Sequence, residues 1–200
     1  MSKHDLNAAA FLRCVEPLLD SPQVNSMKQW RHHFSVTCYE HSLFVSYVAF
    51  RLARYLGWDY RAAARAGLLH DLYLYDPADR AAHPGNQCFD HPKIAAENAA
   101  KLTKLTSKEE NIIRSHMWPL SPVPPRSPEA WLVDLVDTVC ACLELTLANG
   151  EVVSLSVAAD SCPNFAVNGV YYDYRPTAVW DSREFYECFD EIPWGWEETL

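Results

Sequence analysis

An alanine-rich segment of this chain ends in Arg65-Ala66-Gly67-Leu68-Leu69-His70-Asp71. Asp59 can cap a helix that begins at Tyr60, and we expect this helix to run to about Tyr73. The small and apolar residues that lead up to the histidine and the aspartate place this pair inside the protein. A buried carboxylate without a partner costs several kcal/mol. Packing alone therefore does not explain the pair, and its side chains need polar partners or a cation.

The composition sets bounds on domain number and on partners. The 200 residues are 49% apolar and 12% aromatic, which is enough for one sizeable core. We expect a main helical domain over residues 1–150 and a C-terminal appendage over 151–200, which serves for packing, as an interface or as a lid. A formal charge of -9 and a pI of about 5.3 argue against broad electrostatic binding to nucleic acid polymers or to an anionic membrane.

The chain has no recognisable membrane or export signal. No stretch approaches the ~18 apolar residues of a membrane span, and Met1-Ser2-Lys3-His4-Asp5-Leu6 lacks the basic-then-apolar order of a signal peptide. We therefore expect a cytoplasmic protein. Its seven cysteines are scattered, and the closest pair is Cys140 and Cys142. This pattern predicts reduced thiols.

Apolar periodicity and capping signals predict further helices along the chain. The long loop from Asp76 to Asp90 lacks periodicity, as functional or mobile loops often do. After Asn149-Gly150 the composition changes to β-prone stretches and a hairpin signal at Asn168-Gly169. The expected helices cover Asp5 to Leu19, Cys38 to Leu56 with Gly57 as C-cap, a segment that starts at His91-Pro92, a segment with a capping box at Ser107-Lys108-Glu109-Glu110, and Glu129 to Ala148.

These helices present polar side chains from apolar surfaces. His41 shares a stripe with Phe44, Val45 and Val48, where a lone histidine is usually a hydrogen-bonded core residue. The other members of the set change this interpretation, because six donors from five segments suffice for one crowded metal site or two adjacent ions. A zinc-finger type of site is disfavoured because no cysteine accompanies them. The six donors are His41, His70, Asp71, His91, His116 and Asp137.

The order His41, His70-Asp71, Asp137 resembles the ligand pattern of the HD-domain metal-dependent phosphohydrolases. His91 and His116 fall between the pair and the final aspartate, which is similar to the binuclear branch of that superfamily. Over about residues 25–148 the chain also resembles a group of small bacterial HD-domain proteins. The fold that the resemblance implies is all-α, a bundle of five or more helices with the metal site between them. To this we add the small irregular or α+β C-terminal appendage.

The resemblance also implies roles for the six donors. One set holds a first ion, and two histidines complete a second, with an aspartate as bridge. Because imidazole and carboxylate ligands are mixed, the cofactor is one or two divalent ions, with iron, manganese, zinc, nickel and magnesium all open. The implied chemistry is hydrolysis of a phosphate ester, of a nucleotide or another small phosphorylated metabolite, by a metal-activated water. The first set is His41, His70, Asp71 and Asp137, the second is Asp71, His91 and His116, and the catalytic pair is His70 and Asp71.

Candidate substrate-binding residues lie near these ligands in the sequence. Lys93, Arg80 and Arg114 are positive groups that could bind a phosphate, although such residues are more often solvated surface charges. His33, eight residues before His41, resembles a position used by the small bacterial group. Cyclic-di-GMP is disfavoured as substrate, because Leu74 replaces a lysine of the enzymes that cleave it and their Gly-Tyr-Pro signature is absent.

Two other functions stay open at this stage. A mixed-valent di-iron oxygenase similar to myo-inositol oxygenase uses the same ligand types in the same order. A catalytically inactive nucleotide-sensing HD module is a third interpretation, although the complete ligand set argues against it. The expected partner is a small phosphorylated molecule, and the sequence leaves a homodimer open.

Overall fold

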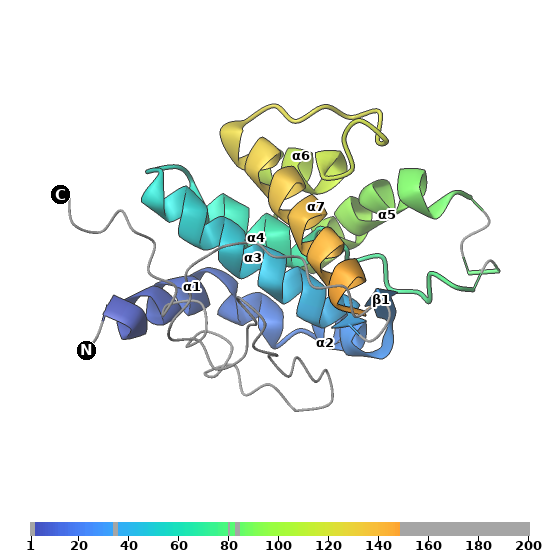
Figure 1. Ribbon diagram of the computed structural model, residues 1–200, viewed down its shortest axis with the longest axis horizontal. Helices are drawn as coiled ribbons and strands as arrows, with labels where there is room; N and C mark the ends of the chain where they lie inside the picture. The colour runs from blue at the N-terminus through green and yellow to red at the C-terminus, as the bar shows by residue number, and fades with distance from the viewer. Residues whose placement is uncertain (1–2, 34–35, 80, 83–84, 149–200) are drawn as a thin grey trace.

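The computed structural model describes residues 3–33, 36–79, 81–82 and 85–148, so the predicted C-terminal appendage lies outside the described residues. The described part is a helical bundle with one small antiparallel hairpin and a short 3-10 turn, η1 (Figure 1). This confirms the all-α prediction. The elements are α1 (Lys3–Leu19), α2 (Pro22–Ser26), η1 (Met27–Gln29), β1 (Arg31–His33), β2 (Val36–Thr37), α3 (Cys38–Tyr55), α4 (Tyr60–Leu69), α5 (Gln87–Leu102), α6 (Ser107–Ser115) and α7 (Pro128–Ala148).

Helices α3 and α4 lie side by side at the centre, where small residues let their backbones approach closely (Figure 1). A Cβ on Gly67 would lie only 2.9 Å from the Cα of Ser46, so α4 needs a glycine at this crossing. The Ser46 hydroxyl donates to the Ala64 carbonyl oxygen at 2.6 Å across the same contact. This close packing holds the end of α4, and with it His70, against α3.

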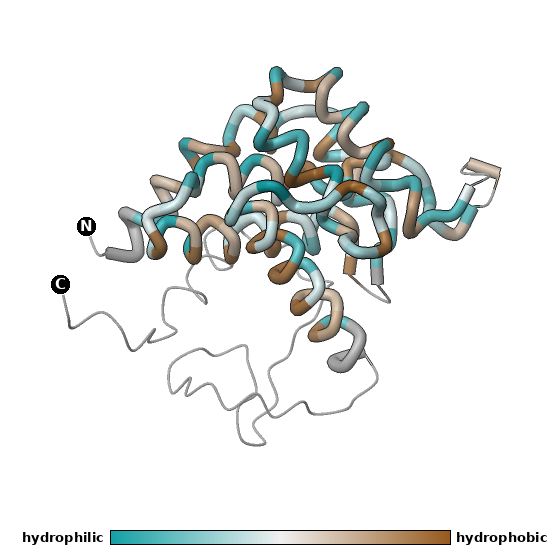
Figure 2. Tube along the Cα trace, turned by 90° about the horizontal axis from the view of Figure 1, so that it is seen from above, coloured by the Kyte–Doolittle hydropathy of each residue, from teal (hydrophilic) through white to brown (hydrophobic). Residues whose placement is uncertain are grey.

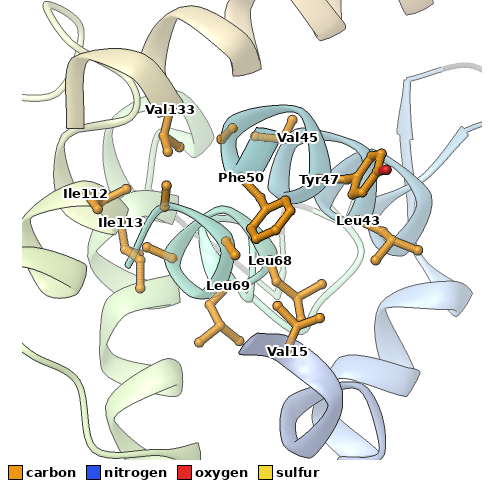
Figure 3. Close-up of a cluster of buried hydrophobic side chains, with 14 of the residues drawn as sticks. Val15, Leu43, Val45, Tyr47, Phe50, Leu68, Leu69, Ile112, Ile113 and Val133 are labelled. Atoms are coloured by element: carbon orange, nitrogen blue, oxygen red, sulfur yellow. The ribbon is translucent and has the colours of Figure 1, made fainter. Parts of the chain in front are cut away.

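The hydrophobic core surrounds this central pair. Phe50 and Leu68 are fully buried between α1, α3 and α4, and Ile112 extends the cluster to α6 (Figure 3). The ring of Phe11 meets that of Tyr47 edge to face, with centroids 5.1 Å apart. Along the helices of Figure 2, hydrophobic and hydrophilic residues alternate at short intervals, as amphipathic helices of a bundle do. Among the described residues, no helix is both long and apolar enough to cross a membrane.

Arg65, in the stretch that precedes the His70-Asp71 pair, joins α4 to α6. Its Nε donates to Glu109 Oε1 at 2.6 Å, and one terminal nitrogen donates to Thr103 Oγ1 at 3.2 Å. Glu109 is buried and also belongs to the capping box that begins α6. The start of α6 is therefore tied to the helix that delivers the pair.

Several helix ends differ from the predictions. Helix α4 stops at Leu69, four residues before Tyr73, and His70 is its C-cap. Helix α5 begins at Gln87, so His91 lies in its second turn and not at its N-terminus. The N-cap of α6 is Thr106, one residue before the predicted start.

The predicted end of α3 agrees with the structure to within one residue, whereas its N-terminal capping box was not predicted. Gly57 follows the C-cap Leu56 with a φ of 69°, the left-handed conformation that commonly ends a helix. At the other end, Thr37 and Glu40 form a capping box. Within the described residues, Cys14, Cys38 and Cys140 are buried free thiols, and reduced cysteines stay a prediction for the rest of the chain.

The hairpin of β1 and β2 was not predicted. It is short, and its pairing is irregular between Arg31 and His33. The Cys38 amide at the start of α3 donates to the Trp30 carbonyl oxygen at 2.9 Å, which fastens the hairpin to the bundle. Strand β1 consequently passes beside the N-terminal end of α3, close to His41.

Candidate metal centre

The structure brings the six predicted donors into one buried cluster. They come from α3, the end of α4, α5, the end of α6 and α7, and none exposes more than 7% of its surface. One or two buried titratable side chains would be ordinary in a protein core. Six of them in one interior need hydrogen-bond partners or cations to offset the cost of their desolvation. The cluster comprises His41, His70, Asp71, His91, His116 and Asp137.

His70 and Asp71 both reach the cluster because α4 ends just before them. Adjacent positions of a continuous helix point about 100° apart, whereas a helix end relaxes this constraint. His70 Nδ1 donates to the Gly67 carbonyl oxygen at 2.7 Å, which turns Nε2 towards the cluster. The two oxygens of Asp71 face different groups: Oδ2 lies 3.5 Å from His70 Nε2, and Oδ1 lies 3.3 Å from His91 Nε2. This arrangement is that expected of a bridging carboxylate.

His91 and His116 face each other through their Nε2 atoms. Their Nε2 atoms are 2.8 Å apart. Each Nδ1 lies 2.7 Å from a main-chain carbonyl oxygen, that of Gln87 or Ile113. Because a carbonyl oxygen only accepts hydrogen bonds, both Nδ1 atoms carry the proton, and both Nε2 atoms present lone pairs when the rings are neutral. Two lone pairs at this distance repel each other unless one ring also carries a proton on Nε2 and donates it to the other, or a metal ion accepts both lone pairs.

A second group forms around Asp137 on α7. Its Oδ1 lies 2.8 Å from His41 Nε2 and 3.5 Å from His70 Nε2. On the other side of the His41 ring, Nδ1 lies 2.9 Å from Glu144 Oε1. His41 is therefore held between two carboxylates, one in the cluster and one behind it.

The donors fit one or two divalent cations. His70 Nε2 and Asp71 Oδ1 are buried and have no hydrogen-bond partner within the described part of the chain. Leaving such atoms unsatisfied is costly in a protein interior. Three groups of donors each have their ligand atoms within 4.8 Å of one another: His41, His70 and Asp137; His70, Asp71 and His116; and His32, His41 and Asp71.

The electrostatics of the cluster agree with a cation site. Burial alone would raise the pKa of Asp71, but the surrounding histidines, His70 first, hold it well below its usual value. Burial likewise acts to raise the pKa of Asp137, but the hydrogen bond from His41 and the nearby charge of His70 hold it well below its usual value. Burial and the neighbouring histidines lower the pKa of His116 to about 3. At neutral pH the metal-free cluster therefore offers two ionised carboxylates and a neutral His116.

His41 is the exception, because it is protonated at neutral pH when no metal is bound. Burial lowers its pKa, but hydrogen bonds to Asp137 and Glu144 outweigh this effect and raise the pKa to about 10. The proton on Nε2 satisfies Asp137 in place of a cation. A metal ion must displace this proton before His41 can bind it.

Two residues that contact the cluster were missed by the sequence analysis. His32 on β1 places Nδ1 3.4 Å from Asp71 Oδ2, and its ring stacks on His41 with centroids 4.2 Å apart. Glu144 contacts His41 from α7. Glu144 lies seven residues after Asp137, two turns along the same helix face, so its spacing was a usable signal.

Two of the four predicted substrate-binding residues, Lys93 and Arg114, are described by the structure and are not brought to the cluster. Lys93 is exposed, with Nζ 3.9 Å from Glu97 Oε1, and Arg114 pairs with Glu110 at 3.3 Å. Both cations line one surface depression between α5 and α6. Lys93 follows His91 by two residues, about 200° around the helix, and so projects from the other side of α5. Arg80 and the side chain of His33 lie outside the described residues.

Comparison with protein families gives one match. The model of the HD domain matches residues 38–142, slightly more than half of the chain. The chain belongs to the HD-domain family. Comparisons with curated proteins and with solved structures found no match. The matched region of the HD domain contains all six predicted donors but neither His32 nor Glu144, which lie just before and just after it.

Proposed function

We propose that this HD-domain protein is a metal-dependent hydrolase that cleaves a phosphate ester of a nucleotide or of another small phosphorylated metabolite. The observation that carries the proposal is the position of Asp71. Its two oxygens face separate nitrogen donors, and Oδ1 is buried without a hydrogen-bond partner among the described residues. A carboxylate so placed suits two neighbouring cations, and metal pairs are a common device for phosphate ester hydrolysis.

The donors divide into two overlapping ligand sets. The first ion would be held by the residues around Asp137, and the second by the facing histidines, with Asp71 common to both. A bound divalent ion would lower the pKa of a water molecule towards neutrality and neutralise negative charge on the phosphoryl oxygens. The proposed sets are His41, His70, Asp71 and Asp137 for the first ion and Asp71, His91 and His116 for the second.

The chain contributes by fixing the ligands in advance. Main-chain carbonyl oxygens hold the Nδ1 protons of His70, His91 and His116, so each ring keeps Nε2 towards the cluster. Such outer contacts set the tautomer and the orientation of metal-binding histidines. Burial excludes bulk water and strengthens electrostatic interactions with a phosphate.

The positive charge for substrate binding would come largely from the metal centre. Lys93 and Arg114 pair with glutamates at the surface depression, away from His91 and His116. The protein carries a formal charge of -9, which disfavours binding of a long polyanion through its surface as a whole. A small phosphorylated substrate fits this distribution of charge.

The direct test combines metal analysis with substrate screening. The full-length protein is purified without chelators, its metal content is measured, and phosphomonoesters and phosphodiesters are assayed for hydrolysis. We expect bound divalent metal and phosphate-ester hydrolysis that is lost in His70→Ala, while Lys93→Ala retains the metal. Iron-dependent oxygen consumption without hydrolysis would instead support the di-iron oxygenase alternative. Nucleotide binding by a protein that holds no metal would support the inactive module.

A further inference from the structure

His32 occupies a distinctive position beside the cluster. It comes from strand β1, whereas the six predicted donors come from helices or helix ends. Its side chain is 17% exposed, and that of Asp71, which it faces, is 2% exposed. The ring is nearly parallel to that of His41, with an interplanar angle of 27°. His32 thus lies at the edge of the buried cluster nearest to solvent.

The contacts of His32 Nδ1 are those of a donor beside an anion. This nitrogen lies 3.4 Å from Asp71 Oδ2 and 3.4 Å from the Tyr73 hydroxyl. Both distances exceed the usual 2.7–3.2 Å of a hydrogen bond from a ring nitrogen. Burial, first of all, raises the pKa of Tyr73, so its hydroxyl stays neutral beside Asp71. His32 Nδ1 therefore lies near the ionised Asp71, at a distance longer than that of a typical hydrogen bond.

His32, His41 and Asp71 form a third donor group. Their ligand atoms lie within 4.8 Å of one another, and two of the three residues belong to the ligand sets proposed above. We propose that His32 is a seventh ligand of the metal centre and binds the ion that His41 and Asp71 share. The proposal rests on the metal centre of the proposed function and adds to it a residue outside the family match.

A further imidazole bears on the class of metal. With His32 the centre has five imidazoles and two carboxylates. Imidazole suits zinc, iron, nickel and cobalt, whereas magnesium favours carboxylate, carbonyl and water oxygens. His32 therefore favours a transition metal over magnesium as the resident ion.

Substitutions at position 32 separate a ligand from a packing residue. His32→Phe keeps a ring to stack on His41 but removes the nitrogen. His32→Asn loses the ring but places an amide close to the position of Nδ1. His32→Ala removes both. Gln29→Phe introduces the same ring at an exposed position of the preceding turn and serves as control.

The measurement is a titration of the metal-stripped full-length proteins with Co²⁺, followed by visible absorption and calorimetry. We expect His32→Phe and His32→Ala to weaken binding of one Co²⁺ by 10-fold or more and to change the spectrum. His32→Asn should recover part of the affinity, and Gln29→Phe should behave as wild type. A parallel Mg²⁺ titration should show a smaller effect of His32→Phe.

Wild-type affinity and spectrum in both His32→Phe and His32→Ala would show that His32 only packs on His41, and would overturn the proposal. If the phenylalanine variant does not fold, the alanine and asparagine variants decide the question. Phosphate-ester hydrolysis is assayed separately. If the substitutions at position 32 weaken Co²⁺ binding but the wild-type protein hydrolyses no phosphate ester, His32 is a ligand and the proposed function is refuted. If the wild-type protein hydrolyses phosphate esters but the substitutions leave Co²⁺ binding unchanged, the proposed function stands and the role of His32 as a ligand is refuted.

Discussion

The Nε2 atoms of His91 and His116 lie 2.8 Å apart in the interior of this HD domain, although the residues are 25 positions apart in sequence. Main-chain carbonyl oxygens hold an Nδ1 proton on each ring, so a metal ion that binds both Nε2 atoms would relieve the repulsion between their lone pairs. His116→Ala should therefore remove one equivalent of metal and leave the ion around Asp137 in place. Metal analysis of the variant checks this, and an unchanged ratio of metal to protein would contradict the two-ion arrangement.

Glu144 should set the affinity of the first ion without binding it. Its carboxylate accepts from His41 Nδ1 at 2.9 Å, which directs Nε2 to the cluster. Loss of such an outer partner commonly weakens metal binding by about 10- to 100-fold. Glu144→Gln should show a loss of this size in a Co²⁺ titration, with helical content unchanged. The matched control is Glu97→Gln, an exposed glutamate on α5. Equal affinities in the two variants would count against the role of Glu144.

Gly67→Ala tests the crossing of α3 and α4. Helix propensity alone would make the alanine variant more stable by up to about 1 kcal/mol. The new Cβ would, however, lie 2.9 Å from Ser46 Cα, a backbone atom that cannot rotate away. We expect the clash to dominate and to lower the free energy of unfolding by about 1–3 kcal/mol. Urea denaturation measures the difference, and a gain in stability would show that the two helices separate easily.

The metal-free protein should lose stability as the pH rises above neutrality. The folded-state pKa of His41 is about 10, above the value of 6.5 for a free histidine, because Asp137 and Glu144 outweigh burial. The stabilisation from this protonation is complete below pH 6.5 and is lost as the pH approaches 10. Denaturation of chelator-treated protein at pH 7 and pH 9.5 should differ by a few kcal/mol at most. His41→Gln should flatten this dependence, and an equally steep profile in the variant would assign the effect elsewhere.

The six central donors were predictable because each combines a strong local signal with a resemblance. His41 lies on a regular apolar stripe, and His70-Asp71 follows a run of small and apolar residues. The family match over residues 38–142 is consistent with this order of residues. Periodicity and family pattern together were enough to predict a buried, mixed imidazole and carboxylate site.

Local geometry that depends on irregular backbone was not predictable. Helix α4 stops at Leu69, and Leu74 then adopts a left-handed backbone conformation with a φ of 62°. Neither position is a glycine or a proline, so the sequence carried no signal for this turn. Helix α5 accommodates Pro92 in its second turn, where a helix start was expected. His32 lies beside Asp71 on β1 of an irregular hairpin that the sequence did not signal. The resemblance to the small bacterial HD-domain proteins had pointed to His33.

The most direct test of the metal centre is the metal content of Asp71→Ala, measured on full-length protein purified without chelators beside the wild type. Asp71 faces both proposed ligand sets, so the account predicts that this variant loses both ions and all phosphate-ester hydrolysis while it keeps its helical content. A folded Asp71→Ala protein with the metal content of the wild type would contradict the assignment of the site.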